Sequence, residues 1–256
     1  MKSIGQTIKS IIYRVFPMEI YLRILSALFF VSFRLGILKN SENYFNLYFL
    51  KNLIRKGDSV IDIGANLGYY SVFFSKLIGN DGKLYSVEPV KQMLEVLRRN
   101  LKAKKNVTIF PYALGEENKT VNLGNDTVSQ KGYMRSGSHK IIDQNQEVDV
   151  TFNAEMKKGS ELFKDLEKID FIKCDIEGYE WIVLKEMESV IVKHRPSLLI
   201  ETRRENRRLL LQFFKEKDFT SYILQDRKLV PATPDNYLDI FVFPNEKIST
   251  ISSFIN

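Results

Sequence analysis

Cysteine is almost absent from this chain of 256 residues, in which Cys174 stands alone. A single cysteine excludes an internal disulfide and a zinc site built from cysteines. Cys174 lies in an apolar stretch, so we expect it to be inert packing in a reducing, cytoplasmic compartment. Repeats and low-complexity tracts are also missing, and the apolar fraction of 44% supports one large domain with a real core.

A long uncharged apolar run is missing as well. The most apolar stretch, residues 20–38, is interrupted by Arg23 and Arg34, and the ten uncharged residues left between 24 and 33 are too few to span a bilayer. The segment also lacks a small-residue cleavage pattern, so we do not expect a signal peptide.

Excess charge of one sign is missing from most of the chain. Residues 1–56 hold nine Lys/Arg and two Glu, and therefore carry the whole net charge of +7, whereas residues 57–256 hold 29 basic and 29 acidic side chains. This balance argues against a basic nucleic-acid groove over the larger part. Residues 1–16 show the pattern of a basic amphipathic helix. We expect residues 1–40 to form a helical cap on a domain of residues 41–256, with peripheral contact of residues 1–38 with an anionic membrane as the open alternative.

The glycine pattern lacks what two common nucleotide sites require. Val60–Ser71 read as a buried strand, a glycine turn and a helix start, which together can cradle an anionic ligand. Asn66 and Tyr69 stand where a dinucleotide fingerprint needs glycine, and Tyr69–Ser71 lacks the Gly-Lys of a P-loop. Binding of NAD through a dinucleotide fingerprint, or of ATP through a P-loop, is therefore disfavoured. The remaining D-x-G-x-N-x-G pattern of Asp62–Gly68 resembles motif I of class I S-adenosylmethionine-dependent methyltransferases.

A second acid closes the next expected strand. Glu88 ends residues 83–88, twenty residues past Gly68, where a βαβ unit places its ribose-binding carboxylate. A carboxylate can accept hydrogen bonds from both ribose hydroxyls. Pro89 then stops the strand and leads into a helix expected at residues 91–101.

The sharpest chemical signal is a polar triplet at the end of the strand expected at residues 169–174. In an extended chain Lys173, Asp175 and Glu177 point to the same side. Ligands of open α/β sheets bind outside the carboxyl ends of the strands, so we expect these side chains to lie beside the Asp62 turn.

Strands alternate with helical patterns along the chain, which is typical of a parallel α/β sheet. We expect a helix at residues 42–56 and seven strands, near residues 59–63, 83–88, 106–110, 169–174, 197–202, 219–225 and 238–243. Residues 111–158 break this rhythm and are polar and turn-rich. We interpret them as an insertion at the carboxyl edge of the sheet, placed to cover a substrate.

Four landmarks occur in the order found in a known family: Asp62–Gly68, Val87–Pro89, Ala113–Gly115 and Lys173–Glu180. They resemble those of FkbM-type methyltransferases over about residues 42–202. The resemblance implies a Rossmann-like class I methyltransferase fold, with a seven-stranded, mostly parallel sheet, helices on both faces and a reversed final hairpin. It also implies S-adenosyl-L-methionine as methyl donor. The cofactor-binding residues would be Asp62, Gly64, Ala65, Asn66, Gly68, Glu88 and Pro89, with Tyr112 and Ala113 beside the adenine.

Methyl transfer to a hydroxyl requires in-line alignment and a group that takes the hydroxyl proton. We expect Asp175 to be this base and Glu177 to be the second candidate, with contact to the methionine amino group as the alternative role of Asp175. Lys173 would tune the carboxylates or the substrate. The spacing does not demand a metal, although Asp175, Glu177 and Glu201 offer the ligands of a divalent ion.

Two further residues leave alternatives open. Glu201 follows the strand expected at residues 197–202 and either reaches the same pocket or pairs with Arg203 or Arg204. His139 lies in the insertion and is either a second candidate base or a surface residue, and we expect it on the surface.

These patterns together favour an O-methyltransferase that acts on a hydroxyl of a sugar, a glycan or a lipid-linked saccharide, with no specific nucleic-acid partner. The first alternative is an RNA methyltransferase on the same fold, which would carry an Asn/Asp-Pro-Pro-Tyr-like turn where Asp175–Gly178 stands. The second alternative is a non-catalytic binding module. The presence of an acid at every expected strand end argues against it.

Overall fold

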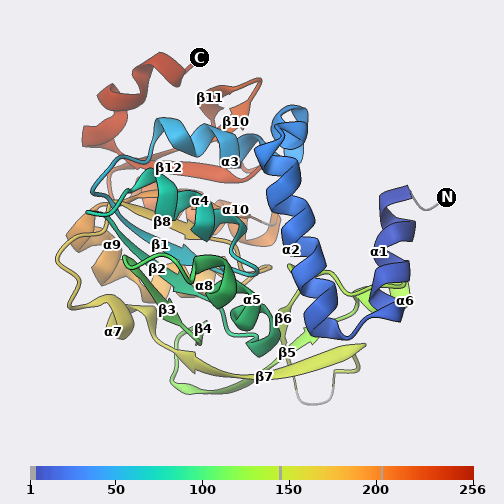
Figure 1. Cartoon of the computed structure of the whole chain (residues 1–256). Helices are drawn as coiled ribbons and strands as arrows, with labels where there is room; N and C mark the ends of the chain where they lie inside the picture. The colour runs from blue at the N-terminus through green and yellow to red at the C-terminus, as the bar shows by residue number, and fades with distance from the viewer. Residues whose placement is uncertain (1–3, 144–145, 203) are drawn as a thin grey trace.

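The computed structural model describes residues 4–143, 146–202 and 204–256, so Met1–Ser3 of the expected N-terminal segment and Arg203 lie outside it. Figure 1 shows a central sheet with helices around it. The sheet has eight strands in the order β3-β2-β1-β8-β9-β12-β10-β11. Their bounds are β1 Ser59–Ile63, β2 Lys83–Val87, β3 Val107–Phe110, β8 Phe171–Cys174, β9 Ser197–Ile200, β10 Phe219–Gln225, β11 Lys228–Pro231 and β12 Ile240–Pro244.

The directions of the strands confirm the expected fold. Strands β3, β2, β1, β8 and β9 run parallel, and β12 runs antiparallel to both β9 and β10. All seven expected strands are present, but the expectation of only seven in the sheet is wrong, because β11 adds an antiparallel edge. Asp226 and Arg227 both adopt positive φ in the turn between β10 and β11. Turns with this geometry usually contain glycine. Because neither residue of this turn is glycine, the sequence did not indicate a hairpin here.

Two helical layers cover the sheet. Alternate residues of β1 face opposite layers, since Ile61 and Ile63 pack in one core cluster and Val60 in another. The first cluster includes residues of α8 (Glu180–Glu186), α9 (Glu188–His194) and α10 (Arg204–Lys215), and α7 (Gly159–Phe163) also contributes to it. The opposite face is covered by α3 (Phe45–Phe49), α4 (Tyr69–Leu77) and α5 (Lys91–Leu101). Strand β1 is therefore buried on both sides, as its β-branched residues indicate.

The insertion, which its sequence marks only as polar and turn-rich, forms a second sheet. Its order is β4-β7-β5-β6, and its strands are β4 Ala113–Leu114, β5 Lys119–Asn125, β6 Lys140–Ile142 and β7 Val150–Lys157. A short helix, α6 (Thr127–Lys131), follows β5. Buried side chains of β5 and β7 share a core cluster with Leu67 and with Tyr21 and Leu22 of the N-terminal segment.

The N-terminal segment consists of α1 (Ile4–Val15) and α2 (Met18–Arg34), followed by a short 3₁₀ turn, η1 (Ile37–Asn40). Helix α2 packs against α5, where Asn100 donates a hydrogen bond to Ser26. None of the helices in the described ranges has both the length and the apolarity that a membrane span needs.

The single helix expected at residues 42–56 is wrong. The segment is broken into η2 (Glu42–Tyr44), α3 and η3 (Leu50–Asn52). Leu47, Phe49 and Leu50 are all buried, yet they would fall on different sides of a continuous helix. Short 3₁₀ turns redirect the backbone so that all three reach the core.

Candidate active site

A cavity of about 290 Å³ lies at the carboxyl ends of β1, β2, β8 and β9. Its wall is formed by the turn after β1, by residues 88–90 after β2, by the turn after β8 and by Glu201 after β9. The insertion closes the cavity with Leu123 and Ile141 of its sheet. This size is near the lower end of ligand pockets, roughly 300 to 1,000 Å³, and the insertion has the covering position that its sequence indicates.

The turn after β1 packs directly against the turn after β8. Gly64 has φ +77°, and a Cβ built on it would lie 1.9 Å from the carbonyl oxygen of Asp175. Gly68 has φ +88°, and a Cβ there would meet Leu97 of α5 at 2.9 Å. Gly64 therefore brings the two turns together, and Gly68 lets the α4 terminus approach α5.

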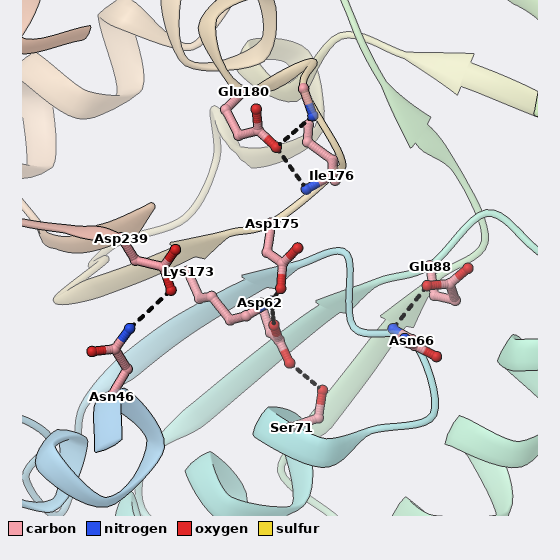
Figure 2. Close-up of polar contacts among 11 residues, drawn as sticks. Asn46, Asp62, Asn66, Ser71, Glu88, Lys173, Asp175, Ile176, Glu180 and Asp239 are labelled. Carbon is pink, nitrogen blue, oxygen red and sulfur yellow. Dashed lines mark hydrogen bonds and ion pairs between the residues drawn. The ribbon is translucent and has the colours of Figure 1, made fainter. Parts of the chain in front are cut away.

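Glu88 lies in the wall of the cavity and is 6% exposed. One of its carboxylate oxygens accepts the N–H of Asn66 at 2.8 Å (Figure 2). The other oxygen accepts the N–H of Val90 at 2.9 Å. Because each oxygen has a second lone pair, both retain acceptor capacity. Burial raises the pKa of Glu88 to about 7, although the two backbone donors oppose this rise.

A buried row of charges runs beneath the cavity, from Asp175 through Lys173 and Asp62 to Ser71 (Figure 2). The Lys173 ammonium lies 3.1 Å from an Asp175 oxygen and 3.6 Å from an Asp62 oxygen. The other Asp62 oxygen accepts the Ser71 hydroxyl at 2.6 Å. Asp62 is not among the described residues that line the cavity; it holds Lys173 from below.

The protonation states of this row follow from its geometry. Burial alone would lower the pKa of Lys173, but Asp175 and Asp62 together raise it, so the ammonium stays charged. Burial raises the pKa of Asp62, and Lys173 opposes that rise. Lys173 is 3% exposed, whereas the side chain of Asp175 is 38% exposed. Asp175 therefore presents the open end of the row to the cavity.

Three carboxylates meet at this open end. Asp175, Glu177 and Glu201 each place one oxygen within 4.8 Å of the others, and all three line the cavity. Burial, the Asp175 charge and a hydrogen bond with Asp175 raise the pKa of Glu201 well above its usual value. Glu201 therefore keeps its proton at neutral pH and donates it to Asp175. The expected alternative partners of Glu201, the side chains of Arg203 and Arg204, lie outside the described residues.

Glu180 is a structural residue of the site that the sequence analysis missed. It is 1% exposed, and one of its oxygens accepts the N–H groups of Ile176 and Gly178, each at 3.0 Å (Figure 2). It thus fixes the turn in which Glu177 adopts φ +59°. The sequence offers only an acid near a helix start, a signal too common to single it out.

The insertion and its flanks contribute further residues to the cavity. Tyr112 and Ala113 line it as expected, together with Pro89. The expectation that His139 lies on the surface is wrong, because it lines the cavity with its ring 5.2 Å from that of Phe152. Folding of the insertion into a sheet turns His139 inward, and burial lowers its pKa to about 4, so the imidazole is neutral at pH 7.

Comparison with known proteins identifies a family. The sequence model described as Methyltransferase FkbM domain matches residues 62–221. A solved structure of methyltransferase FkbM from Methylobacillus flagellatus KT is similar in fold, with a TM-score of 0.53 and 19% identity over 78% of this chain and 47% of that one.

Curated relatives match more locally. A protein-L-isoaspartate O-methyltransferase of Ignicoccus hospitalis is 32% identical over 90 residues, which are 35% of this chain and 36% of that protein. A probable cobalt-precorrin-6B C(15)-methyltransferase of Saccharolobus solfataricus is 40% identical over 47 residues, 18% of this chain and 24% of that protein. The chain thus spans about a quarter to a third of the length of these two relatives.

Proposed function

The chain belongs to the FkbM methyltransferase family, and from that premise we propose that it transfers a methyl group from S-adenosyl-L-methionine to a hydroxyl oxygen of a saccharide. One observation carries the proposal: the cavity joins an oriented buried carboxylate, Glu88, to a charged carboxylate cluster around Asp175. Glu88 is suited to bind the ribose of a nucleoside, and the cluster around Asp175 is suited to a hydroxyl group that must lose a proton.

The residues present fit S-adenosylmethionine. Glu88 lines the cavity, and each of its oxygens accepts one backbone N–H and keeps a second lone pair, which is the acceptor capacity that two ribose hydroxyls require. The Asn66 side-chain oxygen is buried with no partner among the described residues, so it can accept a further donor from a ligand. Tyr112 and Ala113 offer an apolar edge for the adenine. When bound, the cofactor supplies an electrophilic methyl group on a sulfonium.

Asp175 is the group that we assign to the acceptor proton. Its carboxylate is held from below by the Lys173 ammonium and from the side by the proton of Glu201. Both contacts fix its orientation, while its exposed fraction leaves it accessible to a hydroxyl. Asp175 would take the hydroxyl proton as the oxygen receives the methyl group, and the electron pair of the methyl–sulfur bond would stay on the donor sulfur, which leaves as S-adenosylhomocysteine.

The other acids have different roles in this proposal. Glu177 lies beside Asp175 and binds a neighbouring hydroxyl or replaces Asp175 as base. Glu201 is protonated, so it acts as a hydrogen-bond donor and not as the base. Lys173 is a positioning residue, because it is buried between Asp62 and Asp175. Adjacent carboxylates bind paired hydroxyls well, which supports a saccharide as the acceptor.

The proposal is tested by calorimetry with S-adenosylhomocysteine, followed by transfer of labelled methyl groups from S-adenosylmethionine to glycan fractions. Asp175→Asn should keep S-adenosylhomocysteine affinity within about tenfold and lower transfer by about 10² to 10⁴. Asp165→Asn, which changes an exposed acid that does not line the cavity, is the matched control and should behave as wild type. Absence of S-adenosylhomocysteine binding by the wild-type protein would refute the assignment.

A further inference from the structure

Helix α1 turns its apolar stripe away from the protein. Ile8, Ile11 and Val15 share one side of the helix and are 48%, 57% and 65% exposed. The opposite side carries Ser10, which is 8% exposed and whose hydroxyl donates to the carbonyl of Gly132 at 3.0 Å. The helix is therefore attached to the body by the side that carries Ser10, Ile12 and Tyr13, of which Ile12 and Tyr13 pack against the core. Figure 1 shows α1 at the outer edge of the molecule, beside α6.

Helix α2 also exposes apolar side chains on its outer side. Its inner side buries Tyr21 and Leu22 in the core, whereas Ile20, Val31 and Leu35 on its outer side are 41%, 55% and 68% exposed. Nine of the thirteen exposed large hydrophobic side chains in the described part of the chain lie between residues 8 and 37. We call Ile8, Ile11, Val15, Ile20, Val31 and Leu35 the outer face.

Positive charge surrounds the outer face. Arg14, Arg34 and Lys39 are exposed on α1, α2 and η1. Residues 1–56 carry the full net charge of +7, and the rest of the chain is neutral. An apolar stripe with basic residues beside it is the composition of helices that lie in the headgroup region of anionic bilayers.

A second copy of the chain is a poorer occupant of this face. A symmetric dimer through the outer face would bring two segments of charge +7 together, and their repulsion opposes association. An anionic surface instead gains from the same charge. No helix in the described ranges is suited to cross a bilayer, so the contact is interfacial.

We propose that the outer face of α1 and α2 docks the protein onto an anionic lipid bilayer. The apolar side chains enter the boundary between headgroups and acyl chains, and the basic residues contact lipid phosphates. The docking surface is distinct from the cavity, and its existence does not depend on methyl transfer.

A side chamber of about 380 Å³ lies between the N-terminal helices and the insertion, and it shares lining residues with the cavity of the proposed active site. Lys9 of α1 and Leu28 and Phe29 of α2 form one wall, and Arg135 and Gly137 of the insertion form part of another. Arg135 and Gly137 also line the main cavity. Resting on the proposed function, this arrangement favours an acceptor presented at the bilayer, such as a lipid-linked saccharide, over one dissolved in water.

Co-sedimentation of the full chain with vesicles tests the docking. Vesicles of equal parts phosphatidylcholine and phosphatidylglycerol should bind the wild-type protein, whereas phosphatidylcholine alone should not. The triple variant I8S/I11S/V15S should lose at least about tenfold in vesicle affinity. The R14S/R34S variant should lose about 25-fold in vesicle affinity at low salt, since each basic residue near the surface contributes about fivefold.

Matched controls separate docking from general stickiness. V192S/L209S removes two side chains of similar exposure, 48% and 43%, elsewhere on the surface, and K105S/K215S removes two exposed charges outside residues 1–56. Both should bind vesicles as wild type does. Calorimetry with S-adenosylhomocysteine on every variant checks folding and reports on the proposed function separately.

Two results would overturn the proposal: wild-type protein that ignores anionic vesicles, or an I8S/I11S/V15S variant that binds them as strongly as wild type. A concentration-dependent dimer that this variant abolishes, without vesicle binding by the wild type, would assign the outer face to a second copy instead. Vesicle binding without S-adenosylhomocysteine binding would refute the proposed function and leave the docking intact.

Discussion

Replacing Lys173 with methionine should destabilise the protein strongly, although the substitution conserves much of the side-chain volume. Lys173 is 3% exposed and is shared between Asp62, which is fully buried, and Asp175. Its removal leaves the Asp62 carboxylate without a cation in the core. Breaking a buried ion pair from one side costs about 3 to 5 kcal/mol, a large part of the roughly 5 to 15 kcal/mol that stabilises a typical domain.

The measurement is urea unfolding followed by far-UV circular dichroism. Lys168→Met is the matched control, because Lys168 pairs with Asp170 at 3.0 Å but is 54% exposed. A solvent-exposed pair of this kind contributes about 0 to 1 kcal/mol. The double variant D62N/K173M removes both buried charges and should recover at least about 2 kcal/mol of the loss.

The pH dependence shows whether the loss is electrostatic. Without Lys173, the pKa of Asp62, which burial already raises, rises further. A raised folded-state pKa gives stability that is present at low pH and is lost as pH rises through that pKa. The cost of Lys173→Met should therefore be larger at about pH 8 than at about pH 5. An equal cost at both pH values, or a cost below about 1 kcal/mol, would refute the buried row as a charged network.

Four further predictions concern the turns around the cavity. Glu88→Gln should weaken S-adenosylhomocysteine binding at least about tenfold in calorimetry; an unchanged affinity would remove Glu88 from the site. In the wild type the pKa of about 7 predicts that this affinity rises between about pH 6 and pH 8, since the ionised carboxylate accepts hydroxyl donors, and a flat profile would contradict the assignment. Gly64→Ala should lower the melting temperature far more than Gly57→Ala, because both residues have positive φ but only Gly64 meets an atom, the Asp175 oxygen at 1.9 Å; similar losses would show that strain alone matters. Glu180→Ala should cost about 2 to 4 kcal/mol in urea unfolding by orphaning two backbone N–H groups, and a loss below about 0.5 kcal/mol would show that the turn holds without it.

Much of the sheet was predictable because its strands are short apolar runs with punctuation at their ends. Ser59–Ile63 and Phe219–Gln225 match the expected bounds without change. The expected 169–174 strand begins two residues later, at Phe171. The second sheet was not predictable from residues 111–158, because its short strands alternate with turns and gain stability only from packing against Leu67 and α2.

The site was predictable where a residue type follows a strand end. Glu88, Lys173, Asp175 and Glu177 all line the cavity, as the topology of an open sheet requires. The sequence could not show that Asp62 lies below the cavity, because that depends on its partner in register on β8, Lys173, which lines the cavity where Asp62 does not. Nor could it show that Glu201 shares its proton with Asp175, since that depends on a distance between two strands.

Helix α1 shows a limit of another kind, because periodicity defines an apolar stripe but not the surface that the stripe meets. A helix that covers a core turns its apolar stripe inward. A helix that lies on a membrane has the same spacing of apolar residues, so the sequence does not distinguish the two. The deciding observation is three-dimensional: Ser10 faces Gly132, so Ile8, Ile11 and Val15 on the other side have no protein surface to cover. Three side chains of this size exposed together cost solubility unless they meet an apolar phase. The confinement of the net charge of +7 to residues 1–56 indicates which phase that is.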